Sequence, residues 1–218
     1  MAHQLSVETD EFVKTLKDAS LYASNEDGIK ATSYIMLSLN QKKKTISVIG
    51  CDGKGYYERA VQLIPEKGQK ASLPGKAMSL FIPAREIKAI AKIAKCHGPM
   101  RLEAAEAINN TYQVHLAFPN SSSHNFSSPA NLEVPDYAGI RKLAEKGKKS
   151  TLNIGQVMLP INELTRAGKV FPVKIGSTIP MYIAKWKTGG LVTLLEYQSE
   201  IERVDIKVIF ALGISEAA

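Results

Sequence analysis

The sequence predicts an α+β protein built from repeats of one unit, in which a strand is followed by a helix and then by three strands. Three observations favour this class. The same order of hydrophobic patterns occurs three times along the chain. Turn-forming pairs, such as those at 98–99 and 189–190, separate the patterns. Hydrophobic residues make up 44% and charged residues 22% of the 218, which is typical of a folded protein.

The first unit is expected between residues 5 and 64. A strand at 5–7 leads into a helix that Thr9 or Asp10 can cap. Apolar residues recur near the helical period in this helix, at Phe12, Val13, Leu16 and Ala19. Three strand-like runs complete the unit, at 33–39, 45–51 and 58–64.

The second and third units repeat this order. The second opens with a strand at 79–82, and Pro83 is well placed to begin a helix that covers 84–95. Its three strands are expected at 100–104, 111–118 and 123–127. The third unit has a strand at 156–159, a helix at 161–167, and strands at 181–187, 191–197 and 204–212.

Residues 119–149 interrupt the repeat with a Ser/Asn-rich start and a basic end. We expect a solvated basic linker at 138–150, although residues 137–146 could instead form a helix of a degenerate fourth unit. The predicted organisation is a complete two-unit domain at 1–137, the linker, and a second, shortened domain at 151–218.

Catalytic and metal sites are not expected. Cys51 and Cys96 lie far apart without a CxxC pair, which argues against a zinc site or a disulfide scaffold. The four histidines lack the spacing of metal ligands, and no phosphate-loop, dinucleotide or nucleophile-elbow motif occurs. We therefore predict no enzymatic activity, no metal and no cofactor.

A cytoplasmic protein is the expectation, because neither a signal peptide nor a run of apolar residues long enough to cross a membrane is evident. The net charge of +7 suits a polyanionic partner.

A basic stripe on the second helix is the most informative feature of the sequence. Its members recur at intervals of three or four residues, which places them on one helical face: Arg85, Lys88, Lys92 and Lys95. The first and third helices carry smaller versions, formed by Lys14 and Lys17 and by Arg166 and Lys169. One stripe alone usually marks a solvated helix face. Stripes on three repeated helices predict a shared surface for phosphates.

This surface is expected to bind duplex DNA through its backbone. It is rich in lysine, with no interleaved Asn, Gln or aromatic residue that would read bases or stack on single strands. Binding should then be independent of sequence and strongly dependent on salt.

Three short motifs, Cys-Asp-Gly-Lys-Gly-Tyr at 51–56, Phe-Ile-Pro-Ala-Arg at 81–85 and Val-Pro-Asp-Tyr at 134–137, resemble segments of the bacterial sliding clamp, the beta subunit of DNA polymerase III. Residues 51–56 (Cys-Asp-Gly-Lys-Gly-Tyr) resemble the Thr-Asp-Gly-His-Arg-Leu segment of its middle domain, and residues 134–137 (Val-Pro-Asp-Tyr) resemble the Phe-Pro-Asp-Tyr that closes that domain. Between them, residues 81–85 resemble its strand-to-helix entry. The order and spacing of the motifs agree, so the resemblance covers about residues 5–137 by motif and the rest by pattern.

The resemblance implies a DNA-clamp fold with antiparallel sheets outside and basic helices facing duplex DNA. It also implies a groove that receives short hydrophobic peptides from a polymerase, a clamp loader or other partners. The motif places Gly53, Lys54 and Tyr56 at this groove. Phe210 and Leu212, in an apolar final strand, are candidates for its floor, with burial in the core as the alternative.

Two departures from the family leave the ring open to question. Lys54 and Gly55 replace the histidine and arginine of the family segment. Clamp chains contain six or four repeated units, whereas three are evident here. Either residues 119–149 hide a fourth unit and three chains close a ring, or the last domain is a half and four chains do so, or no ring forms.

The leading prediction is a homo-oligomeric processivity factor of the sliding-clamp type. The alternative is a clamp-derived interaction protein that binds partner peptides or a host clamp without encircling DNA. The third interpretation is an unrelated basic α+β protein, with or without an enzymatic role.

Overall fold

The computed structural model describes residues 3–24, 31–66, 68, 70–74, 78–105, 109–147, 157–158, 160–171, 179–185, 191–199 and 204–214. Its strands are β1 (His3–Glu8), β2 (Tyr34–Asn40), β3 (Thr45–Cys51), β4 (Gly55–Gln62), β5 (Ser79–Pro83), β6 (Pro99–Ala104), β7 (Thr111–Ala117), β8 (Ser123–Pro129), β9 (Val157–Met158), β10 (Met181–Lys185), β11 (Leu191–Ser199) and β12 (Val204–Ile214). Its α-helices are α1 (Thr9–Ser20), α2 (Ile87–Ile93), α3 (Tyr137–Gly147) and α4 (Ile161–Val170). The repeated strand–helix–three-strand order is therefore present three times in the described part of the chain.

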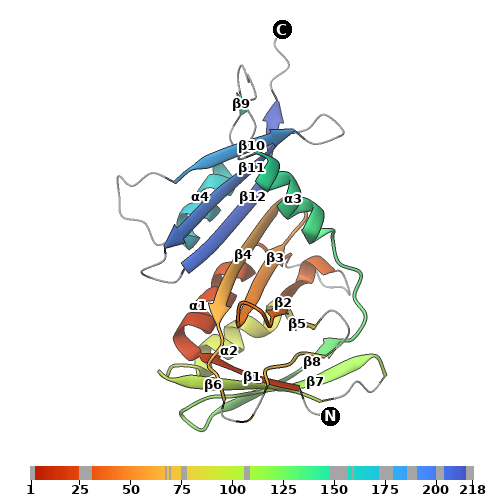
Figure 1. The fold of residues 1–218 in the computed structure, drawn as a ribbon, viewed down its shortest axis with the longest axis vertical. Coiled ribbons are helices and arrows are strands. Elements are labelled where there is room, and N and C mark those ends of the chain that lie inside the picture. Colours follow the sequence, from red (N-terminus) through yellow and green to blue (C-terminus); the bar gives the residue numbers. More distant parts are fainter. Residues whose placement is uncertain are drawn as a thin grey trace.

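The strands form two antiparallel sheets (Figure 1). One has four strands in the order β1-β6-β7-β8, and the other has eight, in the order β10-β11-β12-β4-β3-β2-β5 with β9 paired to β12. The first two units exchange their opening strands, because β1 pairs with β6 of the second unit and β5 pairs with β2 of the first. Pairing of β12 with β4 joins the third unit to the first.

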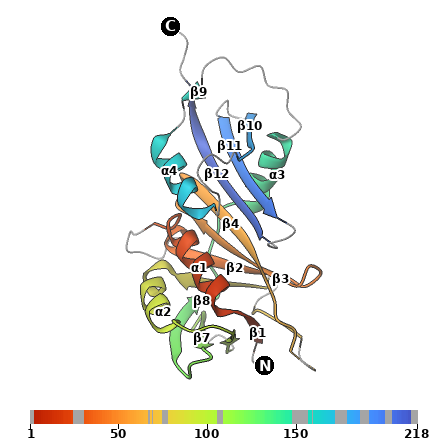
Figure 2. The same ribbon diagram turned by 90° about the vertical axis from the view of Figure 1, so that its left-hand side faces the viewer.

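Three helices lie on one side of the sheets and one lies on the other (Figure 2). The helices α4, α1 and α2, one from each unit, follow one another in a column, which we call the helix side. The helix α3 covers the opposite face of the eight-stranded sheet, which we call the α3 side.

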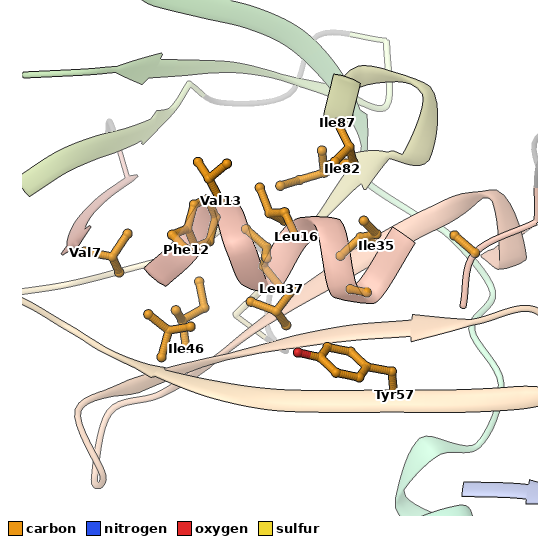
Figure 3. Close-up of a cluster of buried hydrophobic side chains, with 14 of the residues drawn as sticks. Val7, Phe12, Val13, Leu16, Ile35, Leu37, Ile46, Tyr57, Ile82 and Ile87 are labelled. Atoms are coloured by element: carbon orange, nitrogen blue, oxygen red, sulfur yellow. The ribbon is translucent and has the colours of Figure 1, made fainter. Parts of the chain in front are cut away.

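Strand alternation divides the buried side chains between the two sides. Ile46 and Val48 of β3 belong to the main core beneath α1, whereas Ile49 belongs to a smaller cluster on the α3 side. Figure 3 shows Phe12 and Leu16 of α1 packed within the main core, close to Leu37 of β2. Because β3, β4 and β12 are covered on both faces, their sequences are apolar at consecutive positions.

The predicted basic linker at 138–150 is wrong over its first ten residues, which belong to α3. The helix forms because the Asp136 carboxylate accepts the N–H of Gly139, 2.8 Å away, and because Tyr137 packs on the sheet. It lies opposite the column of unit helices and so does not occupy the position of a fourth unit helix.

Three smaller expectations also change. Thr9 does not cap α1, because its hydroxyl donates to the Gly98 carbonyl at 2.6 Å. The second helix is shorter than predicted: residues 84–86 form a 3₁₀ turn and α2 ends at Ile93, before Lys95. The turn expected at 189–190 lies outside the described residues.

In the described ranges, every helix is too short or too polar to cross a lipid bilayer. Cys51 and Cys96 are both free thiols, and Cys51 is buried.

Candidate nucleic-acid interface and partner surface

Seven of the eight cations predicted to contact DNA are exposed on or beside the helices of the helix side. They are Lys14 and Lys17 on α1, Arg85, Lys88, Lys92 and Lys95 on or next to α2, and Lys169 on α4. Of these, Arg85 lies 3.6 Å from the Glu86 carboxylate, and the six lysines form no ion pair with another described residue.

The carboxylates of the same helices are largely turned toward the protein. Glu11 pairs with the buried Arg59 at 3.2 Å, and Glu86 contacts His124 at 3.0 Å. Burial raises the pKa of Asp18 to about 6, against the opposing effect of nearby cations that include Lys14. Asp10 of α1, beside His97, is an exposed exception, so the helix side presents lysines to solvent with few competing carboxylates.

Arg166, the eighth predicted DNA contact, is not available as one. Its side chain is only 19% exposed and its guanidinium lies 2.7 Å from Glu163 and 2.8 Å from Asp52. It also donates to the Leu21 carbonyl at 2.5 Å and lies 4.4 Å above the ring of Tyr22. Because two carboxylates neutralise it, Arg166 instead links α4 to the end of α1 and to the β3–β4 turn.

On the α3 side, the start of α3 rests on β4. The rings of Tyr137 and Tyr56 are 5.6 Å apart and tilted by 52°. Arg141 donates through Nε to Glu58 at 2.8 Å and to the Tyr56 hydroxyl at 3.1 Å, and that hydroxyl donates to Glu58 at 2.7 Å. Burial raises the pKa of Tyr56 and of Tyr137, so both phenols remain protonated.

No family model and no curated protein matches the sequence. Solved structures do match. The beta subunit of DNA polymerase from Streptococcus pyogenes is 14% identical with a TM-score of 0.59, and the alignment covers 99% of this chain and 66% of that one. The sliding clamp of Bacillus subtilis is 13% identical with a TM-score of 0.58, covering 100% and 66%, respectively.

The Helicobacter pylori beta clamp is 12% identical with a TM-score of 0.63, covering 97% of this chain and 66% of that chain. This chain has the sliding-clamp fold. It spans 66% of the length of each of these clamps. Another structure of the Helicobacter pylori clamp is bound to a DNA ligase peptide, at 12% identity and a TM-score of 0.58.

The segment that resembles the sliding-clamp motif forms the β3–β4 turn. Gly53 has a φ of +85°, a left-handed conformation that favours glycine, and the Asp52 carboxylate accepts the N–H of Lys54 and of Gly55. Gly53 and Lys54 are exposed at the tip.

The structure explains why glycine occupies position 55, where the sliding-clamp motif has arginine. A Cβ there would lie 2.9 Å from a Glu163 oxygen and 3.0 Å from the ring of Tyr22, so a larger side chain would displace the Glu163 carboxylate or the Tyr22 ring. The departure from the sliding-clamp motif therefore accompanies the close approach of α4.

The structure does not bring the predicted groove residues onto one surface. Tyr56 is 2% exposed and faces α3, whereas Phe210 is 1% exposed and lies in the main core on the helix side. Phe210 aligns with Gly55, and Ile209 aligns with Tyr56, so the register of β12 on β4 separates the two faces. The core alternative holds for Phe210. The backbone of Leu212 pairs with Leu191, and its side chain lies outside the description.

Sequence reasoning missed Glu58 and Arg141, which with Tyr137 and Tyr56 form the contact between α3 and β4. Alternation along β4 places Tyr56 and Glu58 on one face, and this was the available signal. Nothing local indicated their partner, because Arg141 is 83 residues away from Glu58.

A polar cavity of about 200 Å³ lies beside this contact on the α3 side. Glu58 and Arg141 line it together with Ser47, Asp205 and Lys207. Lys207 lies 3.5 Å from Glu196 and 3.6 Å from Glu145 of α3. The α3 side thus has an apolar part under Tyr137 and a charged part beyond Arg141.

Proposed function

We propose that this chain is a processivity factor of the sliding-clamp type, which cradles or encircles duplex DNA on its helix side and tethers a polymerase, a clamp loader or other partners on its α3 side. One observation carries the DNA part: the helices of three units follow one another in a column, with exposed lysines and largely inward-held carboxylates. Such a surface attracts phosphates and reads no bases.

The mechanism is topological and needs no chemistry of the chain's own. Several copies assemble around the duplex in the cytoplasm, and enclosure prevents the tethered polymerase from leaving. Weak contacts between lysines and phosphates, many of them bridged by water, permit sliding. No single contact has to be strong.

The DNA part is tested by a double charge reversal, Lys88→Glu with Lys92→Glu. The matched control is Lys42→Glu with Lys43→Glu, at the exposed β2–β3 turn, which projects away from the helix column in Figure 2. Fluorescence anisotropy with duplexes of two unrelated sequences should show a large, sequence-independent loss of DNA affinity for the first pair and a small loss of affinity for the control. The slope of log K against log salt should fall by about 0.9 for each phosphate contact that is lost.

Equal losses for the two pairs would mean that net charge alone controls binding, and an unchanged affinity for the helix-side pair would refute the assignment of the helix side to DNA.

Assembly is tested by light scattering together with retention on circular and linear DNA. A closed ring predicts a stable oligomer that stays on circular DNA and slides off linear ends. A monomer without topological retention would favour the second candidate function, a clamp-derived protein that binds partner segments or a host clamp. The neutralisation of Arg166, which removes one cation from the helix side, is the observation in favour of that candidate.

A further inference from the structure

The surface beneath α3 has the composition of a binding site. It combines apolar side chains from β3, β4, β11 and β12 with one carboxylate, and we call it the α3 seat: Ile49, Cys51, Tyr56, Glu58, Leu194 and Ile209. All five apolar members are buried, and the Glu58 side chain is 13% exposed. Exposing an apolar surface of this kind to water would be energetically unfavourable.

The helix that covers the seat buries few of its side chains. Tyr137 is the one buried side chain among those described for α3, while Ala138, Lys142, Glu145 and Lys146 are exposed. Gly139 lies within the first turn and lowers the intrinsic stability of the helix. Attachment therefore depends on the Tyr137 ring, on the partly buried Ile140, and on the ion pairs of Arg141 and Glu145 at the helix surface.

We propose that α3 occupies a site that also binds a partner protein. The partner segment presents an aromatic ring and, one helical turn later, a guanidinium or ammonium group. This inference rests on the tethering part of the proposed function. The partner binds the seat when α3 leaves it, so the two compete.

The contacts of α3 define this partner chemistry. Tyr137 and Arg141 are four residues apart, the spacing that places two side chains on one helical face. The ring fills the apolar part of the seat against Tyr56. When Arg141 leaves, the Glu58 carboxylate retains the Tyr56 hydroxyl but loses its cation, in a site where an unpaired charge is costly. A purely apolar segment would leave Glu58 without the guanidinium that now pairs with it, because Lys207, opposite Glu58 in the register of β12 on β4, already pairs with Glu196. A segment with a cation would restore the pair.

The probe for this site is a labelled synthetic peptide with the sequence of residues 134–147 of this chain. Its affinity is measured for the full chain and for the variant Tyr137→Ser, whose own α3 is weakened. The variant should bind roughly tenfold more tightly or better, because apparent affinity scales with the fraction of chains whose seat is open. Lys142→Ser, at an exposed position on the same helix, is the matched control and should bind as the wild type does.

The required cation is tested by a double substitution. The Tyr137→Ser chain should lose affinity when the peptide carries glutamine at the position of Arg141. Adding Glu58→Gln to that chain should abolish the difference in affinity between the arginine peptide and the glutamine peptide. If the difference persists, the cation does not act through Glu58 and the proposal is wrong in its partner chemistry.

Other outcomes also decide the matter. A folded Tyr137→Ser chain that does not bind the peptide would overturn the proposal. A mass that doubles with concentration in this variant without peptide would identify α3 of a second copy as the occupant, and would overturn the proposed partner. If the variant does not fold, hydrogen exchange of the wild type decides: α3 amides that exchange much faster than α1 amides support the proposal, and equal protection overturns it.

The DNA affinity of the Tyr137→Ser chain should equal that of the wild type, because the α3 seat and the helix lysines lie on opposite sides. If the Tyr137→Ser chain binds DNA normally but does not bind the peptide, this inference alone is refuted. If it binds the peptide as expected but the Lys88→Glu, Lys92→Glu pair leaves DNA affinity unchanged, the DNA function alone is refuted.

Discussion

Helices α1 and α3 cover opposite sides of the same sheet but are attached in different ways. Six residues of α1 are buried, namely Thr9, Phe12, Val13, Thr15, Leu16 and Ala19, whereas Tyr137 is the one buried side chain described for α3. The helix α1 also packs against α2 and carries Lys14 and Lys17 toward solvent. The comparison separates the firmly packed α1, which carries two of the lysines proposed to contact DNA, from α3, whose smaller buried contact underlies the proposed exchange with a partner segment.

The largest effect is expected for Phe12→Ala in α1. Phe12 is fully buried in the main core, so the substitution leaves a cavity and should lower the free energy of unfolding by about 3 to 5 kcal/mol. Urea denaturation followed by circular dichroism measures the loss. A loss below about 1 kcal/mol would show that α1 is no more firmly attached than α3.

A smaller loss of unfolding free energy is expected for Arg166→Met, which leaves the carboxylates of Asp52 and Glu163 without their shared cation. Stability should fall by about 2 to 3 kcal/mol, since both partners are less than a fifth exposed. Lys169→Met, at an exposed position on the same helix, should stay within about 0.5 kcal/mol of the wild type. If Arg166→Met weakened DNA binding but left stability unchanged, Arg166 would be a DNA contact after all.

For Tyr137→Ala we expect a loss of about 1 to 2 kcal/mol, because the substitution releases α3 and cannot cost more than the attachment of that helix. Hydrogen exchange should quicken in α3 and remain unchanged in α1. Faster exchange in both helices would mean that the two faces unfold together, and would remove the distinction between them.

A stability change with pH is expected beneath α1. Because burial raises the pKa of Asp18 from 3.8 to about 6, the folded state binds this proton more tightly than the unfolded state does. The resulting contribution to stability is complete below pH 3.8 and is lost as the pH rises through about 6. Asp18→Asn should therefore be more stable than the wild type at pH 7, by about 1 to 2 kcal/mol, and nearly equal to it at pH 4. Urea denaturation at both pH values checks this, and a constant difference between them would contradict it.

Periodicity predicted the scaffold well because its elements repeat. The strands β3 and β7 were predicted to within about one residue, and the predicted apolar face of α1 is the buried one, since alternation and the helical period determine which residues share a face. The alternation of apolar residues along a strand does not determine which of its faces packs against which layer of the fold. Phe210 was therefore assigned to a groove, although the register of β12 on β4 directs it into the main core.

The remaining differences come from contacts between residues that are distant in sequence. The basic composition near residues 138–147 was compatible with a solvated linker or with a helix at 137–146, and the helix that forms depends on packing against the sheet. Arg166 has the spacing of a stripe residue, but its partners Asp52 and Leu21 are 114 and 145 residues away. No local pattern contains that information.

The central claim, that DNA lies against the helix side, is tested most directly by crosslinking from two positions. Lys88→Cys and Lys142→Cys, each in a chain with Cys96→Ser, carry the same thiol-linked photoreactive group on opposite sides of the molecule. Irradiation with duplex DNA should crosslink the Lys88→Cys protein efficiently at low salt and the Lys142→Cys protein weakly. Crosslinking that is equal from both positions, or stronger from Lys142→Cys, would contradict the assignment.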